Sequence, residues 1–177
     1  MKRVIIIEGP CGAGKSAAIQ AARVLRPGLA FVDLDGLKDA TFRLGDRMLW
    51  EESASSLGIE WRRKLASEVG IFWLEKLIIM GRQIAIELCD TLPLQSEICT
   101  VATNHGYEIV EYLLMPPMDI CLVNNKTRSQ AFLFDDDKVR SSYTHYSKKC
   151  SAGYPYLRVV THETELVALL IEECLPS

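Results

Sequence analysis

The chain has 177 residues, of which 49% are hydrophobic and 24% are charged. These proportions are those of a folded globular protein with enough apolar residues to fill a core, so they exclude intrinsic disorder and collagen-like repeats. Twenty Lys and Arg against 23 Asp and Glu give a formal net charge of −3. That charge argues against a protein held to nucleic acid mainly by bulk positive charge. We expect one domain that covers residues 1–177.

The sequence gives no sign of a membrane span, a secretory signal or a disulfide framework. The longest apolar stretch, residues 69–80, carries Glu75 and Lys76 in its middle, which indicates a buried helix with Trp73 in the core. The apolar run near the N-terminus is too short for a signal peptide. The six cysteines lack metal-type spacing, and a chain of this length needs no disulfides. We therefore expect reduced thiols, a cytoplasmic location, and a monomer or small homo-oligomer.

The predicted elements alternate between strands and helices along the chain. Strands are expected at residues 4–7, 29–34, 84–88, 107–115 and 157–161. Helices are expected at residues 15–25, 46–80 (in two pieces that break near Gly58), 94–104, 118–129, 135–149 and 164–174. This alternation predicts an α/β fold with a five-stranded parallel sheet and helices on both faces. Residues 124–150 form a polar segment with little apolar periodicity, which we interpret as a small helical lid.

A glycine-rich loop follows the first predicted strand and precedes the first predicted helix. Its residues fit G-x-x-x-x-G-K-[ST] at every position: Gly9, Pro10, Cys11, Gly12, Ala13, Gly14, Lys15 and Ser16. Small residues allow backbone N–H groups to surround a triphosphate, and the helix N-terminus adds its positive dipole end. The lysine of this motif reaches the β- and γ-phosphates, and the serine hydroxyl is a ligand of Mg²⁺. The motif therefore predicts that these eight residues bind a nucleoside triphosphate.

Two carboxylates stand at the end of the second predicted strand. Asp33 and Asp35 are two residues apart, so they point the same way if the strand continues through both. Ligands of open α/β sheets bind at the carboxyl ends of the strands, where a carboxylate can deprotonate an attacking hydroxyl or hold an acceptor. The alternative is structural: Asp35 and Gly36 form a turn, and Asp33 caps a helix.

Several segments in this order resemble the small P-loop kinases of the polynucleotide-kinase-like group, which are related to zeta toxins, gluconate kinases and shikimate kinases. The glycine loop is the shared part. Residues 35–38 look like the D-x-x-R of that group, with Lys38 in place of Arg. Residues 84–91 are similar to its third strand, with Glu87 where Asp is usual, and residues 124–128 resemble the R-N-x-x-R that opens its lid. The resemblance implies the P-loop NTPase fold.

The resemblance also implies roles for individual residues. Asp35 corresponds to the general base for the acceptor hydroxyl, and Lys38 to the residue that contacts the acceptor. Glu87 would order Mg²⁺ through water. Arg128 matches the lid arginine that touches the nucleotide phosphates, and Arg140, on the return helix of the lid, is a second expected nucleotide-binding residue. Considered alone, each arginine has the alternative of a solvated helix face.

These observations predict an ATP- and Mg²⁺-dependent kinase that transfers the γ-phosphate to a hydroxyl. Asp35, Lys15 and Arg128 are the expected catalytic residues, and Asp33 joins the expected acceptor site. ATP is the expected donor because the guanine motif N/T-K-x-D is absent. The resemblance favours an acceptor in DNA or RNA (a 5′-hydroxyl end or a hydroxyl of a modified base) or in a nucleotide. A small alcohol such as a nucleoside or sugar acid is the alternative, as is a regulatory ATPase with no dedicated acceptor.

Overall fold

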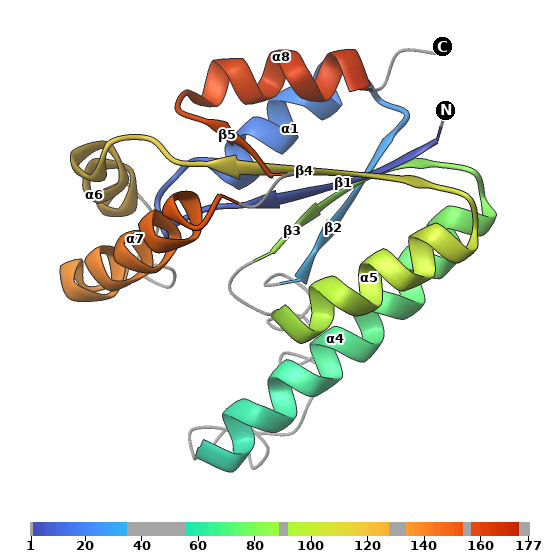
Figure 1. Cartoon of the computed structure of the whole chain (residues 1–177), viewed down its shortest axis with the longest axis horizontal. Coiled ribbons are helices and arrows are strands. Elements are labelled where there is room, and N and C mark those ends of the chain that lie inside the picture. Colours follow the sequence, from blue (N-terminus) through green and yellow to red (C-terminus); the bar gives the residue numbers. More distant parts are fainter. Residues whose placement is uncertain (1, 35–55, 89–91, 128–133, 154–156, 174–177) are drawn as a thin grey trace.

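The computed structural model describes residues 2–34, 56–88, 92–127, 134–153 and 157–173 (Figure 1). The strands are β1 (Arg3–Glu8), β2 (Leu29–Asp33), β3 (Gln83–Glu87), β4 (Glu108–Leu114) and β5 (Leu157–Val160). The helices are α1 (Lys15–Leu25), α4 (Ser56–Ile79), α5 (Leu92–Asn104), α6 (Met118–Lys126), α7 (Asp136–Ser151) and α8 (Glu163–Glu173). No helix in these ranges is long and apolar enough to cross a membrane.

The five strands form one parallel sheet in the order β2-β3-β1-β4-β5. Helices α1 and α8 cover one face, α4 and α5 cover the other, and α6 and α7 lie beyond the carboxyl end of β4 (Figure 1). The predicted α/β class, strand count and parallel pairing are confirmed. Since β1 is central and buried on both faces, each of its residues from Val4 to Ile7 is apolar.

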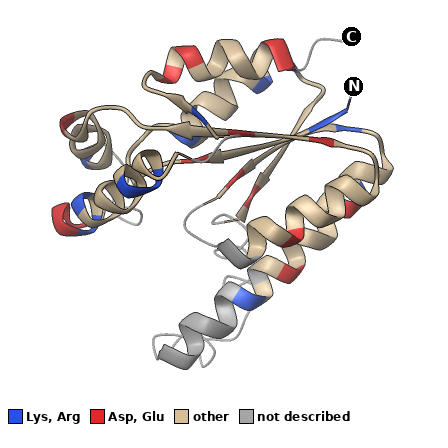
Figure 2. Cartoon of the chain, in the orientation of Figure 1, with Lys and Arg blue, Asp and Glu red and all other residues tan. Residues whose placement is uncertain are grey.

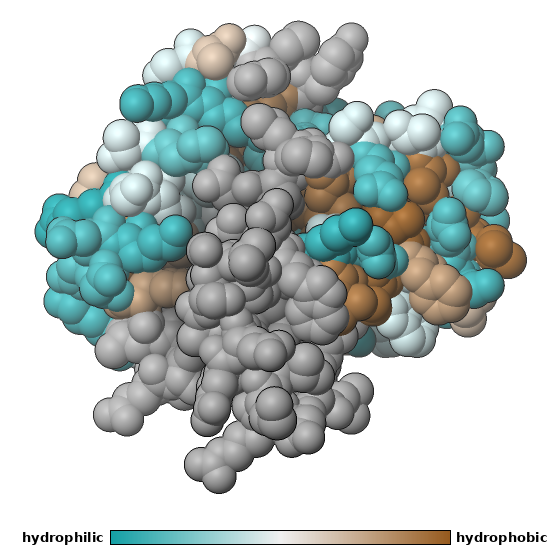
Figure 3. Space-filling model, turned by 90° about the horizontal axis from the view of Figure 1, so that it is seen from below, coloured by the Kyte–Doolittle hydropathy of each residue, from teal (hydrophilic) through white to brown (hydrophobic). Residues whose placement is uncertain are grey.

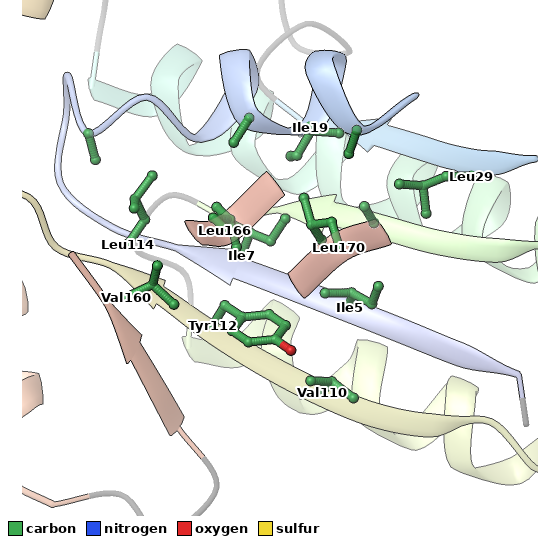
Figure 4. Packing of buried hydrophobic residues seen from close by; sticks show 14 of the residues in the cluster. Ile5, Ile7, Ile19, Leu29, Val110, Tyr112, Leu114, Val160, Leu166 and Leu170 are labelled. Carbon is green, nitrogen blue, oxygen red and sulfur yellow. The ribbon is translucent and has the colours of Figure 1, made fainter. Parts of the chain in front are cut away.

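Alternation along β1 divides the core into two clusters. Ile5 and Ile7 pack toward α1 and α8, together with Tyr112, Leu166 and Leu170 (Figure 4). The intervening residues of β1, Val4 and Ile6, pack toward α4 and α5. The period of two in a strand produces this division.

The Tyr112 hydroxyl is the polar end of an otherwise apolar side chain in the first cluster. It donates a hydrogen bond to Glu173 of α8 at 2.7 Å. Glu173 also forms ion pairs with Arg3 at 2.6 Å and Arg158 at 3.2 Å. Burial raises the pKa of Tyr112 to about 12, and the neighbouring Glu173 carboxylate acts in the same direction. This network fastens the end of α8 to three strands of the sheet.

One expectation about the long helix was wrong. Helix α4 contains Gly58 and ends at Ile79, and the expected break near that glycine stays a prediction, because residues 46–55 lie outside the described residues. Trp73, which was expected in the core, is 50% exposed. In the run from Ile71 to Leu74 only the two end residues, three apart, face the sheet, and Phe72 and Trp73 point outward. Part of the surface on the side of α4 and α5 is correspondingly apolar (Figure 3).

Candidate phosphate-binding site

The glycine loop requires glycine at positions where other parts of the chain come close to it. Gly12 has a φ of 81°, and a Cβ there would overlap the carbonyl oxygen of Cys121 in α6. A Cβ on Gly9 would overlap the carbonyl oxygen of Leu114 at the end of β4. The loop is thus tucked against β4 and α6, an approach that only glycine permits. Burial raises the pKa of the adjoining Cys121 thiol to about 11, against the lowering effect of Lys15.

Helix α1 begins directly after the loop, with a glycine as its N-cap. Its N-cap residue, Gly14, has left-handed backbone angles and provides no side-chain cap. The first N–H groups of a helix have no partner within the helix, and the helix dipole gives that end a partial positive charge. These backbone groups can bind an anion such as a phosphate.

Lys15 is the first residue of α1 and is only 4% exposed. Its ammonium donates to the carbonyl oxygens of Gly9 at 2.8 Å and Pro10 at 3.2 Å. It also lies 3.7 Å from a carboxylate oxygen of Glu87. The charge of Lys15 is therefore held over the start of the loop, with its stem buried.

Ser16 and Glu87 meet at the same place. The Ser16 hydroxyl donates to Glu87 Oε2 at 2.6 Å. Glu87 is the last residue of β3, and its neighbours in register are Ile7 of β1 and Asp33 of β2. The structure thus brings Lys15, Ser16 and Glu87 together. A serine hydroxyl and a carboxylate are oxygen donors of the type that Mg²⁺ prefers.

Of the other predicted site residues, the structure describes Asp33 and Arg140. Asp33 is exposed at the carboxyl end of β2, beside Glu87 in the adjacent strand, at the usual strand separation of about 4.8 Å. Arg140 lies exposed on α7, with Nη1 3.5 Å from the sulfur of Met118 in α6. Asp35, Lys38 and Arg128 lie outside the described residues.

The start of the lid segment contacts the loop through two adjacent asparagines. Asn124 donates from Nδ2 to the carbonyl oxygen of Gly12 at 3.0 Å. Asn125 is fully buried, and its carboxamide forms two hydrogen bonds with the backbone of Phe134. Asn124 therefore connects α6 to the phosphate loop, and Asn125 connects α6 to Phe134, two residues before α7.

Helix α7 contacts the loop from the other end of the lid segment. The Cys11 N–H donates to Ser142 Oγ at 3.2 Å. Lys149 forms an ion pair with Glu8, the last residue of β1, and both side chains are largely buried.

The acidic residues of α7 lie in its first turn and basic residues in its last (Figure 2). The N-cap Asp135 accepts from the Lys138 N–H at 2.6 Å, as expected for an acidic helix start.

A pocket of about 350 Å³ adjoins the loop on the side of α6 and the β5–α8 connection. Its lining combines apolar and polar side chains, and one of them, Asn124, also contacts the loop backbone. The lining residues are Ala13, Pro116, Pro117, Asp119, Ile120, Asn124, Thr161, His162 and Glu163. A concave site with apolar walls and a few polar groups is typical of small-molecule binding.

Sequence reasoning missed the contacts of Asn124, Ser142 and Lys149 with the loop. Each of these contacts joins residues more than 100 positions apart in the sequence. The spacing of Ser142 and Lys149 does place both side chains on one face of a helix. That spacing was the available signal, but it does not tell which partner the face contacts.

Comparisons with known proteins support the fold. No protein-family model matches the chain, and no curated protein matches its sequence. Among solved structures, shikimate kinase from Acinetobacter baumannii is similar at TM-score 0.60 and 14% identity, over 99% of this chain and 97% of that one. A gluconokinase from Sinorhizobium meliloti is similar at TM-score 0.59 and 13% identity, over 97% and 90%.

A chain of the Pnkp1/Rnl/Hen1 RNA repair complex is similar at TM-score 0.60 and 15% identity, over 88% of this chain and 47% of that one. The chain has the fold of the P-loop kinases, and that expectation is confirmed.

Proposed function

We propose that this chain is an ATP-dependent kinase that transfers the γ-phosphate to a hydroxyl group. The observation that carries the proposal is the cluster of Lys15, Ser16 and Glu87 at the mouth of a loop whose backbone is shaped by glycine. It combines a fixed cation, a helix N-terminus and a hydroxyl–carboxylate pair. These are the groups that phosphoryl transfer requires, because its transition state spreads negative charge over several oxygens.

The residues present fit a Mg²⁺ ion carried with the nucleotide. Ser16 would provide a hydroxyl ligand, and Glu87 would hold the water shell of the ion. Glu87 accepts from Ser16 at 2.6 Å, so the two oxygen donors lie together. The ion would supply neutralisation of charge on the phosphate oxygens.

The pocket beside the loop is the proposed site of the nucleotide base. It begins at Ala13 of the loop, so a nucleotide whose phosphates lie on α1 can reach it directly. Pro116, Pro117 and Ile120 offer apolar surface for a flat ring. Asp119 and Asn124 offer polar groups for its edge.

The remaining roles follow the sequence and its resemblance. Asp35 would act as general base, with Asp33 and Lys38 at the acceptor site. Arg128 and Arg140, from the lid, would compensate charge on the transferred phosphoryl group. The position of Asp33 at the carboxyl edge of the sheet, in register with Glu87, supports an acceptor on this side of the nucleotide.

The acceptor we favour is a hydroxyl of a nucleic acid or nucleotide, above all a 5′-hydroxyl end. The support is the sequence resemblance together with the similarity to a chain of an RNA repair complex. The similarity to shikimate kinase and gluconokinase makes small alcohols the second class to be tested.

Thiophosphate transfer from ATPγS to a panel of oligonucleotides and a panel of small alcohols tests this function. Label on 5′-hydroxyl DNA or RNA supports the favoured acceptor, and label on a metabolite supports the second class. Release of free thiophosphate alone indicates an ATPase without a dedicated acceptor. If calorimetry with Mg²⁺ and nucleoside triphosphates shows no heat of binding, the proposed function is wrong.

A further inference from the structure

One face of helix α7 contacts both the phosphate loop and Glu8, the last residue of β1, which precedes the loop directly. Ser142 accepts the Cys11 N–H at 3.2 Å, and Lys149 pairs with the carboxylate of Glu8. The two α7 residues are seven apart, which is close to two helical turns, so both lie on the same face. Val139 and Tyr146, which share this face, are 0% and 3% exposed. The contact is therefore a packed interface.

These two contacts of α7 enclose the part of the loop that holds Lys15. In the chain, Gly9 and Pro10 lie between Glu8 and Cys11, and their carbonyl oxygens accept from the Lys15 ammonium at 2.8 and 3.2 Å. The peptide group between Pro10 and Cys11 is hydrogen-bonded at both polar atoms, to Lys15 through its oxygen and to Ser142 through its N–H. The same oxygen also accepts from the Ala13 N–H at 3.1 Å, so the orientation of this peptide group is set by α7, by Lys15 and by the turn of the loop itself.

We propose that Ser142 and Lys149 are positioning residues, which hold the two carbonyl groups in the orientation that places the Lys15 ammonium for the outer phosphates of the nucleotide. This inference rests on the proposed function, because it assumes that the loop binds a nucleoside triphosphate. Lys15 serves the β- and γ-phosphates, so a misplaced ammonium weakens binding of ATP and leaves binding of AMP unchanged. Neither positioning residue has to touch the nucleotide.

The first test compares Ser142→Ala with Ser141→Ala, since Ser141 is the exposed neighbour on the same helix. Calorimetry with ATP and Mg²⁺ is expected to show about fivefold weaker binding for Ser142→Ala, the effect of one lost hydrogen bond. AMP affinity should stay within twofold of wild type. Ser141→Ala should bind both nucleotides as wild type does, and Ser142→Thr, which keeps the hydroxyl, should restore ATP binding.

The second test compares Lys149→Met with Lys148→Met, because Lys148 is the exposed neighbour. Loss of the buried pair with Glu8 is expected to weaken ATP binding by about tenfold in the first variant only. If Lys149→Met does not fold, the Ser142 variants still decide the matter. Amide hydrogen exchange at Cys11, measured without nucleotide, should be faster in Ser142→Ala than in Ser141→Ala.

The outcomes separate this inference from the proposed function. A wild-type protein that binds no triphosphate contradicts the proposed function itself. A wild-type protein that binds ATP, with Ser142→Ala and Ser141→Ala equal to it, overturns the positioning role and leaves the function standing. Equal losses for ATP and AMP also overturn it, because they indicate general loosening of the fold, and so does unchanged exchange at Cys11.

Discussion

The carboxamide of Asn125 forms hydrogen bonds with both backbone polar groups of Phe134. Its Nδ2 donates to the Phe134 carbonyl at 2.7 Å, and its Oδ1 accepts from the Phe134 N–H at 3.2 Å. Asn125 is fully buried in α6, whereas Phe134 is partly exposed just before α7. One side chain therefore joins the end of α6, whose Asn124 contacts the phosphate loop, to the backbone just before α7.

Replacing Asn125 by alanine is expected to lower the free energy of unfolding by about 1–3 kcal/mol, because two hydrogen bonds are lost at a buried position. Denaturant unfolding measures this change. The matched control is Asn104→Ala, at the exposed end of α5, which should change stability by less than about 0.5 kcal/mol. Equal stabilities for the two variants would show that the Asn125–Phe134 contact does not stabilise the fold.

The Glu87→Gln variant tests the proposed metal role. Glutamine keeps an oxygen that can accept from the Ser16 hydroxyl but removes the negative charge. We expect the Mg²⁺ concentration for half-maximal turnover to rise by about tenfold or more, as is usual when an outer ligand of a metal site is lost. A Mg²⁺ titration of turnover at saturating ATP measures it. Glu111→Gln is the control, since that carboxylate lies near Cys99 on the opposite face of the sheet.

Two further substitutions separate nucleotide binding from transfer. Lys15→Ala should abolish both ATP affinity and turnover, because it removes the cation held over the loop. Asp35→Asn should leave ATP binding nearly intact and reduce transfer by about two orders of magnitude, the usual effect of losing a general base. Calorimetry and thiophosphate transfer measure the two properties. An Asn variant with wild-type transfer would refute the role proposed for Asp35.

The glycine loop also allows a matched pair of substitutions. Gly12→Ala places a Cβ against the Cys121 carbonyl at a φ of 81°, so we expect a loss of about 2 kcal/mol or more of stability together with weaker ATP binding. Gly28→Ala meets no atom within 4 Å and has no positive φ. It should be neutral or slightly stabilising. Thermal unfolding of the two variants is the measurement.

The sequence predicts local features of this molecule better than contacts between distant segments. The structure of β1 and of the glycine loop depends on residues that are adjacent in the sequence, namely a β-branched run and a glycine motif. The strand, the loop and α1 therefore lie where expected. The expectation that Trp73 is buried was wrong because α4 has apolar residues on more than one side, and composition alone does not indicate which of them face the sheet. The ion pair between Lys149 and Glu8 has no signal in the sequence, since nothing near either residue indicates its partner.

Alkaline pH provides a test of the network that fastens α8 to the sheet. The pKa of Tyr112 is raised to about 12 by burial and by Glu173, against about 10 in an unfolded chain. The folded protein therefore favours the neutral phenol. The stabilisation that results is complete below about pH 10 and is lost as the pH rises toward 12. Over this interval it amounts to about 2–3 kcal/mol.

The free energy of unfolding, measured by denaturant between pH 9 and 12, should fall more steeply for wild type than for Tyr112→Phe. The comparison matters because lysines and other tyrosines titrate in the same interval, and their contribution cancels between the two proteins. Glu173→Gln removes a carboxylate that, after burial, helps to raise the pKa of Tyr112, so its decline should still begin near pH 10 but should end below pH 12 with a smaller total loss. Parallel curves for wild type and Tyr112→Phe would mean that the buried hydroxyl ionises in the folded protein as easily as in the unfolded chain.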